Sequence, residues 1–94
     1  MINKDKEQNR EIQIYAYYDR EAEMYDIPFH SFGDLNSIRK FKIDAEKKGS
    51  IIEKFTKEFD LYKLGSFDMH LGKIKLKTEL VIEGRKIAAM TEEK

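Results

Sequence analysis

Two stretches of the chain alternate apolar and polar residues with the period of two that is typical of a β-strand. The first places Ile12, Ile14, Ala16 and Tyr18 on one face, and Gln13, Tyr15, Tyr17 and Asp19 on the other. The second places Ile74, Leu76, Thr78, Leu80 and Ile82 on one face, and Lys73, Lys75, Lys77, Glu79, Val81 and Glu83 on the other. Both are rich in β-branched or aromatic residues, so we predict strands near both ends of the chain.

Residues 23–29 and 59–67 also predict extended structure. Pro28 is the only proline and has no backbone N–H to donate, so the first of these stretches is expected to be an edge strand or a strand end. Residues 68–72 predict a hairpin loop that joins the last two strands, with Gly72 at a positive φ.

The middle of the chain has the 3.6-residue periodicity of an amphipathic helix. Its apolar stripe consists of Leu35, Ile38, Phe41 and Ala45. Asp34 is expected to be the N-cap, because its carboxylate can accept the free N–H groups of the first turn. Gly49 is expected just after the helix, where a residue of positive φ commonly lies. For residues 50–57, a short helical turn under the main helix and a loop both stay open.

The resulting order, β-β-α-β-β, predicts an α+β fold: an antiparallel sheet of about four strands with one amphipathic helix packed on one face. The helix stripe and the apolar face of the last strand are expected to cover each other. Ile12 and Ile14 then point into the core, Tyr15 and Tyr17 point outward, and residues 87–90 cap the core. We expect a disordered arm at residues 1–9, a single domain at 10–90 and a charged tail at 91–94.

Charge and composition narrow the functional classes. The 94 residues include 18 basic and 18 acidic side chains, a balance unlike that of a strongly basic nucleic-acid coat protein. The charge is uneven: residues 1–34 carry four basic and eight acidic side chains, whereas residues 35–58 carry seven and four. An electropositive face and an ordinary solvated helix both fit this pattern. No cysteine is present, which excludes disulfides and thiolate metal sites, and no apolar run is long enough for a membrane span or a signal peptide.

The residues offer little for catalysis. Asp68 and His70 share a loop, but no third metal ligand is evident from the spacing, and an ordinary turn explains both. Asp26 and His30 would lie about 13 Å apart on one strand face, too far to pair. Neither a nucleophile elbow nor a phosphate-binding glycine loop is present. We therefore expect no enzyme, no metal and no cofactor.

Binding of single-stranded nucleic acid is the sharper hypothesis, because it needs exposed aromatic rings for base stacking and cations that follow the phosphates. The candidate binding residues are Tyr15, Tyr17, Arg39, Lys40, Lys73, Lys75 and Lys77. The alternatives are structural: the two tyrosines can pack in an interface, the helix cations Arg39 and Lys40 can be solvation alone, and alternating lysines can protect an edge strand from aggregation.

Several local sequences carry a family resemblance: IYAYYDREAEMY from Ile12, PF at Pro28, IRKF from Ile38, and FDLYKLGSFD from Phe59 followed by Gly72. Together they resemble the small nonstructural protein of gokushovirus-type microviruses, phages with circular single-stranded DNA. The resemblance covers about residues 12–76. It implies a small protein described as DNA-binding or as taking part in single-stranded genome synthesis, acting in the host bacterial cytoplasm.

Two hypotheses follow. The first is a phage accessory protein that binds single-stranded DNA during genome synthesis or packaging. The second is a protein–protein adaptor that recruits phage or host replication proteins through an exposed aromatic face without touching nucleic acid. Aromatic residues left on a sheet face also favour a homodimer.

Overall fold

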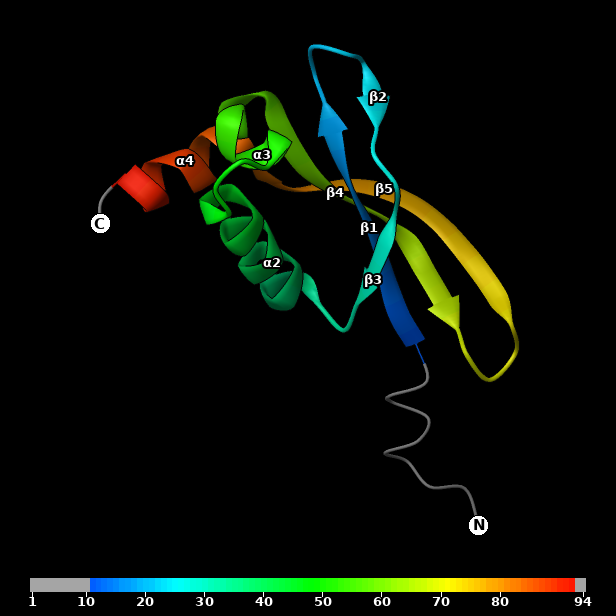
Figure 1. Cartoon of the computed structure of the whole chain (residues 1–94). Helices are drawn as coiled ribbons and strands as arrows, with labels where there is room; N and C mark the ends of the chain where they lie inside the picture. Colours follow the sequence, from blue (N-terminus) through cyan, green and yellow to red (C-terminus); the bar gives the residue numbers. More distant parts are fainter. Residues whose placement is uncertain (1–10, 93–94) are drawn as a thin grey trace.

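The computed structural model describes residues 11–92, which form an antiparallel sheet with helices on one side (Figure 1). Its elements are β1 (Glu11–Asp19), β2 (Met24–Tyr25), β3 (Phe29–Ser31), α2 (Asp34–Glu46), α3 (Ile51–Lys54), the 3₁₀ turn η1 (Thr56–Glu58), β4 (Phe59–Asp68), β5 (Lys73–Glu83) and α4 (Gly84–Glu92). The α+β class and the antiparallel sheet are confirmed. The described sheet has five strands rather than the predicted four. The described chain also has three α-helices rather than the predicted one.

The fifth strand arises from a break at the proline. β2 pairs with β1 at Tyr18 and Asp19, and β3 pairs with β1 from Gln13 to Tyr15, so both short strands lie along the same edge of β1. Residues 26–28 between them are not in a strand, as expected where Pro28 cannot donate to the ladder. From this edge the sheet continues through β4 to β5.

The helices cover the face of β1 that carries the two tyrosines, so the predicted inward and outward faces of this strand were reversed. Tyr15 and Tyr17 are buried in one core cluster with Phe41, Leu61 and Ile87. The predicted exposure of Tyr15 and Tyr17 is therefore wrong. The physical reason is that each tyrosine hydroxyl donates a hydrogen bond to a carboxylate of α2. The polar group of each ring is therefore satisfied while the ring itself is buried.

The predicted helix is confirmed within two residues, but its N-terminus differs in detail. Gly33, not Asp34, is the N-cap, and no side chain caps it. The Asp34 carboxylate instead accepts a hydrogen bond from the Tyr15 hydroxyl at 2.7 Å. Of the predicted stripe, Phe41 and Ala45 are buried and Ile38 is partly buried, whereas Leu35 is 80% exposed.

Residues 50–57 form the short helical turn that the sequence left open. The Ser50 hydroxyl caps α3 by accepting from the backbone N–H of Glu53, and Ile52 is buried. Gly49 has φ 87°, as predicted for the residue that leaves α2. The turn η1 then leads directly into β4.

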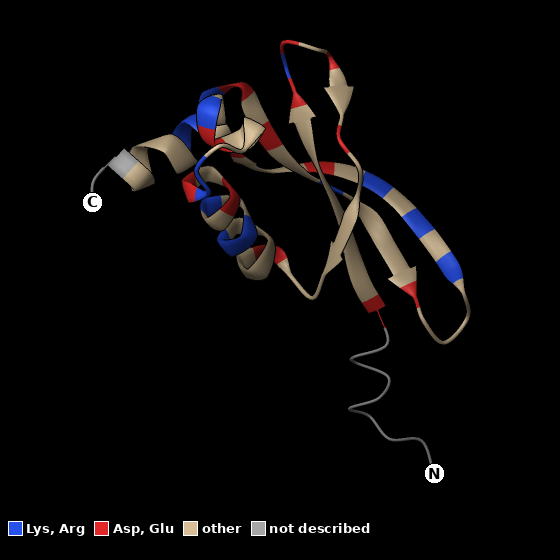
Figure 2. Cartoon of the chain, viewed as in Figure 1, with Lys and Arg blue, Asp and Glu red and all other residues tan. Residues whose placement is uncertain are grey.

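The β4–β5 hairpin is confirmed, with Gly72 at φ 67°. Its lysines alternate with uncharged residues along β5 (Figure 2). Residues 73–80 are all exposed, so the predicted packing of α2 against the apolar face of β5 is wrong. The ladder is irregular opposite Gly65, where an added Cβ would lie 2.0 Å from the Lys75 carbonyl oxygen, and again at Val81. Because of the second irregularity, the side chain of Ile82 lies on the helix side of the sheet. The alternation had predicted it on the same face as Leu76 and Leu80.

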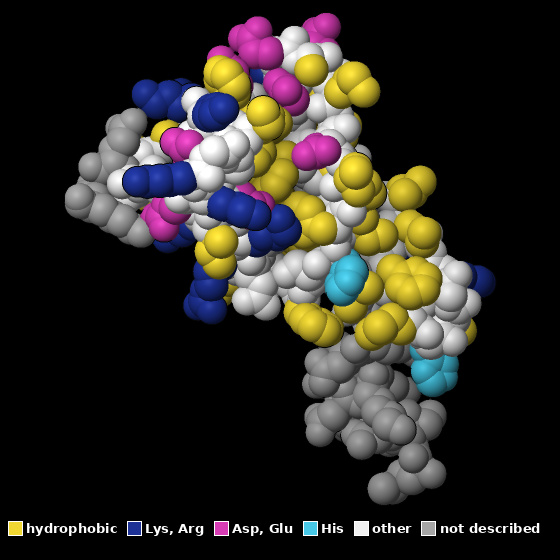
Figure 3. All heavy atoms as spheres, viewed as in Figure 1, with side chains coloured by type: hydrophobic (Ala, Val, Ile, Leu, Met, Phe, Trp, Pro, Cys, Tyr) yellow, Lys and Arg dark blue, Asp and Glu magenta, His cyan; other side chains and the backbone are white. Residues whose placement is uncertain are grey.

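The face of the sheet opposite the helices stays open over the described residues. The pairing registers place one apolar and aromatic set on it: Ile12, Ile14, Tyr18, Tyr25, Tyr62, Phe67, Ile74, Leu76 and Leu80. Ala16 has the same direction by register but is 0% exposed. Leu76 is 85% exposed, and hydrophobic side chains gather over β3 and the adjoining hairpin (Figure 3). The structure thus uncovers the face that the sequence pattern assigned to the core.

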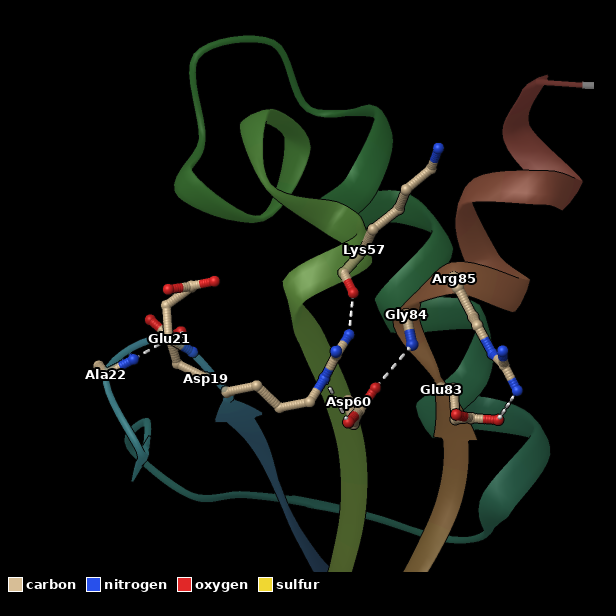
Figure 4. A network of polar contacts seen from close by, with 9 residues as sticks. Asp19, Glu21, Ala22, Lys57, Asp60, Glu83, Gly84 and Arg85 are labelled. Carbon is tan, nitrogen blue, oxygen red and sulfur yellow. Dashed lines mark hydrogen bonds and ion pairs between the residues drawn. The ribbon is translucent and has the colours of Figure 1, made fainter.

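A polar network fixes the start of α4 (Figure 4). The buried Asp60 accepts from the backbone N–H of Gly84 at 3.0 Å and pairs with Arg20 Nε at 3.0 Å, while Arg20 also donates to the Lys57 carbonyl. Gly84 has no room for a side chain, because a Cβ would lie 1.9 Å from the Phe59 carbonyl oxygen. The helix so placed buries Ile87 and Ala88, as predicted for the residues that cap the core, while Ala89 and Met90 are exposed.

The predicted arm at residues 1–9 lies outside the described residues. Of the predicted tail, Thr91 and Glu92 belong to α4, and residues 93–94 lie outside the described range.

Candidate nucleic-acid interface

Two clusters join β1 to opposite ends of α2, and each consists of a tyrosine, an aspartate and a lysine. At the start of the helix, the Tyr15 hydroxyl donates to Asp34, whose carboxylate also lies 3.5 Å from Lys63 Nζ. Near its end, the Tyr17 hydroxyl donates to Asp44 at 2.6 Å. Because both hydroxyls are engaged and both rings are buried, neither tyrosine is placed to stack on a base.

Burial raises the pKa of the Tyr15 and Tyr17 hydroxyls above the ordinary tyrosine value, and the adjacent carboxylates of Asp34 and Asp44 raise it further. Both hydroxyls therefore stay protonated and act as donors over the physiological range. The clusters are structural supports of the sheet–helix contact.

The two helix cations of the candidate set have different surroundings. Lys40 pairs with Asp44 at 2.7 Å and lies over the rings of Phe29 and Tyr17, at 4.6 and 5.4 Å from their centroids. The Lys40 ammonium group therefore interacts with residues at the contact between α2 and the sheet. Arg39 is exposed on α2.

Lys73, Lys75 and Lys77 share one exposed face of β5, as the alternation predicted. That face is on the helix side of the sheet, whereas the prediction placed it on the side opposite the helix. Lys75 lies 3.6 Å from Glu11 and Lys77 lies 3.5 Å from Glu79, but these ion pairs are solvent-exposed and worth about 0–1 kcal/mol each. The three ammonium groups are therefore available to an incoming anion. Alternate residues on a strand are spaced about 7 Å apart, a pitch suited to following a nucleic-acid backbone.

The lysine row points to the helix side of the sheet, where α2 does not reach. On this face Lys75 lies opposite Ser66 of β4, and Ser66 lies opposite Gln13 of β1. Gln13 lines a hollow of about 540 Å³ between the sheet and the start of α2; its other lining residues are Phe32, Gly33, Asp34, Leu35, Asn36 and Lys63. Two strand spacings, about 10 Å, separate Gln13 from Lys75. We call this hollow together with the lysine row the helix-side groove.

Phe32 is the aromatic residue of the helix-side groove and is 72% exposed. Lys63 adds a cation there, and Gln13 and Asn36 add side-chain amides. Sequence reasoning missed Phe32, Lys63, Gln13 and Asn36 as site residues. The available signal was Phe32 itself, a large aromatic residue directly before the glycine that begins the helix.

The open face has its own aromatic cluster, formed by Tyr18, Tyr25 and Tyr62. Their ring centroids lie 4.8, 5.7 and 6.0 Å apart in tilted and edge-to-face arrangements. Asp19 follows Tyr18 and Asp26 follows Tyr25 in sequence, while Asp60, opposite Tyr18, is buried and paired with Arg20. The carboxylates of Asp19 and Asp26 disfavour phosphates, so this cluster is better suited to contact with protein than with nucleic acid.

Other chemistry finds little support in the part of the chain that the structure describes. The Asp68 carboxylate accepts from the backbone N–H groups of His70 and Leu71, which accounts for this pair as a turn. Over residues 11–92, His, Asp and Glu side chains form no group of three that could hold a metal ion. None of the helices in that range has the length and apolar character required to cross a bilayer.

A comparison of the sequence with protein families identifies a phage protein family. The sequence matches the family described as Phage ORF5 protein over residues 12–87, and the chain belongs to that family. Searches among curated proteins and among solved structures found no match.

Proposed function

We propose that this phage accessory protein binds single-stranded DNA along the helix-side groove and has no catalytic activity. The observation that carries the proposal is the joint exposure of three lysines in one row and an aromatic ring in the adjoining hollow. A single strand requires both, because cations neutralise its phosphates and a flat ring stacks with its bases.

In this proposal Lys73, Lys75 and Lys77 follow the phosphates along β5. Lys63, whose ammonium also lies 3.5 Å from the Asp34 carboxylate, adds a fourth cation closer to the helix. Phe32 offers its exposed ring to a base, and the amides of Gln13 and Asn36 can donate to or accept from base edges. The resemblance to gokushovirus-type microviruses supports a single-stranded genome as the ligand and the host cytoplasm as the place of action.

Fluorescence anisotropy with a labelled oligothymidylate tests this proposal. Four phosphate contacts on a single strand give a slope of about −3 for log K against log salt concentration. Replacing Lys73, Lys75 and Lys77 with glutamine should flatten that slope by about two units.

The matched control replaces Lys42, Lys47 and Lys48, three exposed lysines of α2 and its C-terminal end, with glutamine. This variant has the same net charge as the test variant and should keep the original slope. Equal losses of affinity in the two variants would reveal a general charge effect and overturn the assignment to the groove.

The open face supports an adaptor role as the second candidate. A contiguous apolar face of this kind on a sheet is typical of a protein contact. If the chain binds no oligonucleotide at low salt, recruitment of phage or host replication proteins through this face becomes the better interpretation. Substituting Leu76 and Leu80 with serine should then abolish partner binding and leave the fold intact, because both side chains are exposed.

A further inference from the structure

The outer edge of β5 is unpaired among residues 11–92, although β5 is the longest described strand. An edge of this length presents a row of backbone N–H and C=O groups that a further strand can join. All residues from Lys73 to Leu80 are exposed, so neither a helix nor a loop of the described chain shields them.

We propose that β5 pairs antiparallel with β5 of a second copy, in the register that places Thr78 opposite Thr78. The two sheets then form one continuous sheet across a twofold axis. The proposal rests on the self-complementary pattern around Thr78 and is independent of the DNA-binding proposal.

The pattern is complementary on both faces of the strand. In this register Lys77 lies opposite Glu79 of the second copy, and Glu79 lies opposite its Lys77, which gives two cross-strand pairs of opposite charge. On the other face Leu76 lies opposite Leu80 of the second copy, and the reverse, on either side of the central threonines. Apolar side chains thus meet apolar ones, and charged side chains meet their opposites.

Neighbouring registers are less complementary. A shift by two residues in one direction keeps two Lys75–Glu79 pairs but places Lys77 opposite Lys77 between them. The same shift in the other direction keeps two Lys75–Glu83 pairs but places Glu79 opposite Glu79. Like charges directly opposite are unfavourable, and the Thr78 register has none. A shift by one residue turns the lysine face of one copy to the apolar face of the other. The edge lysines therefore select one partner arrangement while they oppose the others.

The arrangement has a consequence for the open face. Joining two sheets edge to edge makes their open apolar faces continuous, and brings the four leucines at positions 76 and 80 together near the axis. Each of these leucines is at least 50% exposed in the single chain. The lysine rows of the two copies would lie side by side on the opposite face. In this register Lys75 lies opposite Val81 of the second copy and has no carboxylate directly opposite, whereas Lys73 lies opposite Glu83.

A single cysteine tests the register directly, because the chain contains none. Residues opposite each other in an antiparallel pair have Cα atoms about 4.5–5.5 Å apart, within the span of a disulfide. Under mild oxidation without DNA, Thr78→Cys should therefore form a covalent dimer readily. The control Leu71→Cys, at the exposed hairpin loop, should form one much more slowly. Equal rates for the two variants, or no dimer, would overturn the register.

Charge reversal provides a second test, read as the dissociation constant of the dimer by analytical ultracentrifugation. Glu79→Lys places like charges opposite each other twice and should weaken the dimer at least about tenfold. Lys77→Glu should do the same. Mixing the two variants should restore association, because each then supplies the charge that the other lacks, and the double variant should dimerise with itself. A wild-type chain that stays monomeric at hundreds of micromolar would refute the proposal, as would a mixture that fails to recover.

Discussion

Replacing Tyr17 with alanine is expected to remove a large share of the folding free energy. The ring is only 5% exposed and lies against Phe41 and Phe29, with centroids 4.9 and 5.6 Å away. Truncating a buried aromatic side chain costs about 3–5 kcal/mol. A domain of this size has a total unfolding free energy of about 5–14 kcal/mol, so the variant should be only marginally folded.

The hydroxyl can be separated from the ring with Tyr17→Phe. This change removes only the hydrogen bond to Asp44, whose carboxylate keeps its pair with Lys40. Hydrogen bonds to charged groups contribute about 1.5–3 kcal/mol, and we expect the lower end because Asp44 remains paired.

Urea unfolding followed by circular dichroism measures both costs. The matched control is Tyr25→Ala, which truncates a 43%-exposed tyrosine on the open face and should cost about 1–2 kcal/mol. If Tyr17→Ala costs no more than Tyr25→Ala, the assignment of the covered face is wrong.

Three further predictions concern stability. The pKa values of Tyr15 and Tyr17 are raised by folding, so their contribution is complete below the ordinary tyrosine value of about 10 and falls as the pH rises above it, by about 1.4 kcal/mol per pH unit for each group. Urea titrations at about pH 8 and about pH 11 should show this loss, and a double Tyr→Phe variant that loses as much would contradict it. Gly84→Ala should cost at least about 2–3 kcal/mol because its Cβ meets backbone oxygens; Gly33→Ala, with open space around it, should be nearly neutral in the same thermal unfolding assay. Asp60→Ala should cost about 2–4 kcal/mol, and Asp60→Asn less because the amide oxygen can still accept from Gly84; equal costs would show that the hydrogen bond to α4 is unimportant.

The elements themselves were readable from the sequence because they depend on local patterns. Period-two alternation located β1 and β5, and the 3.6-residue stripe with Gly49 located α2. The break at Pro28 was also foreseeable, although the sequence did not show that two short strands would share one edge of β1.

The covered face of the sheet could not be read in the same way. Alternation separates Ile12 and Ile14 from Tyr15 and Tyr17 but does not say which set the helix covers. The deciding contacts join Tyr15 to Asp34 and Tyr17 to Asp44, which are 19 and 27 residues apart in sequence. Hydropathy predicted that the isoleucines would be buried, whereas the hydrogen bonds to Asp34 and Asp44 allow the tyrosines to be buried instead.

The candidate site was predicted in part. The lysine row on β5 follows directly from the alternation and is exposed as expected. Phe32 and Lys63 join it only through the pairing of β1 with β4 and the position of the helix start, which no local pattern encodes.

A titration of the isotopically labelled protein with an oligothymidylate at low salt, followed by amide chemical shifts in NMR, tests the central claim most directly. The account predicts the largest shifts at residues 73–77 of β5 and at residues 32–36 beside the hollow, with little change at Tyr18, Tyr25 and Tyr62 on the open face. Shifts confined to those three tyrosines, or no shifts at all, would contradict binding of single-stranded DNA along the helix-side groove.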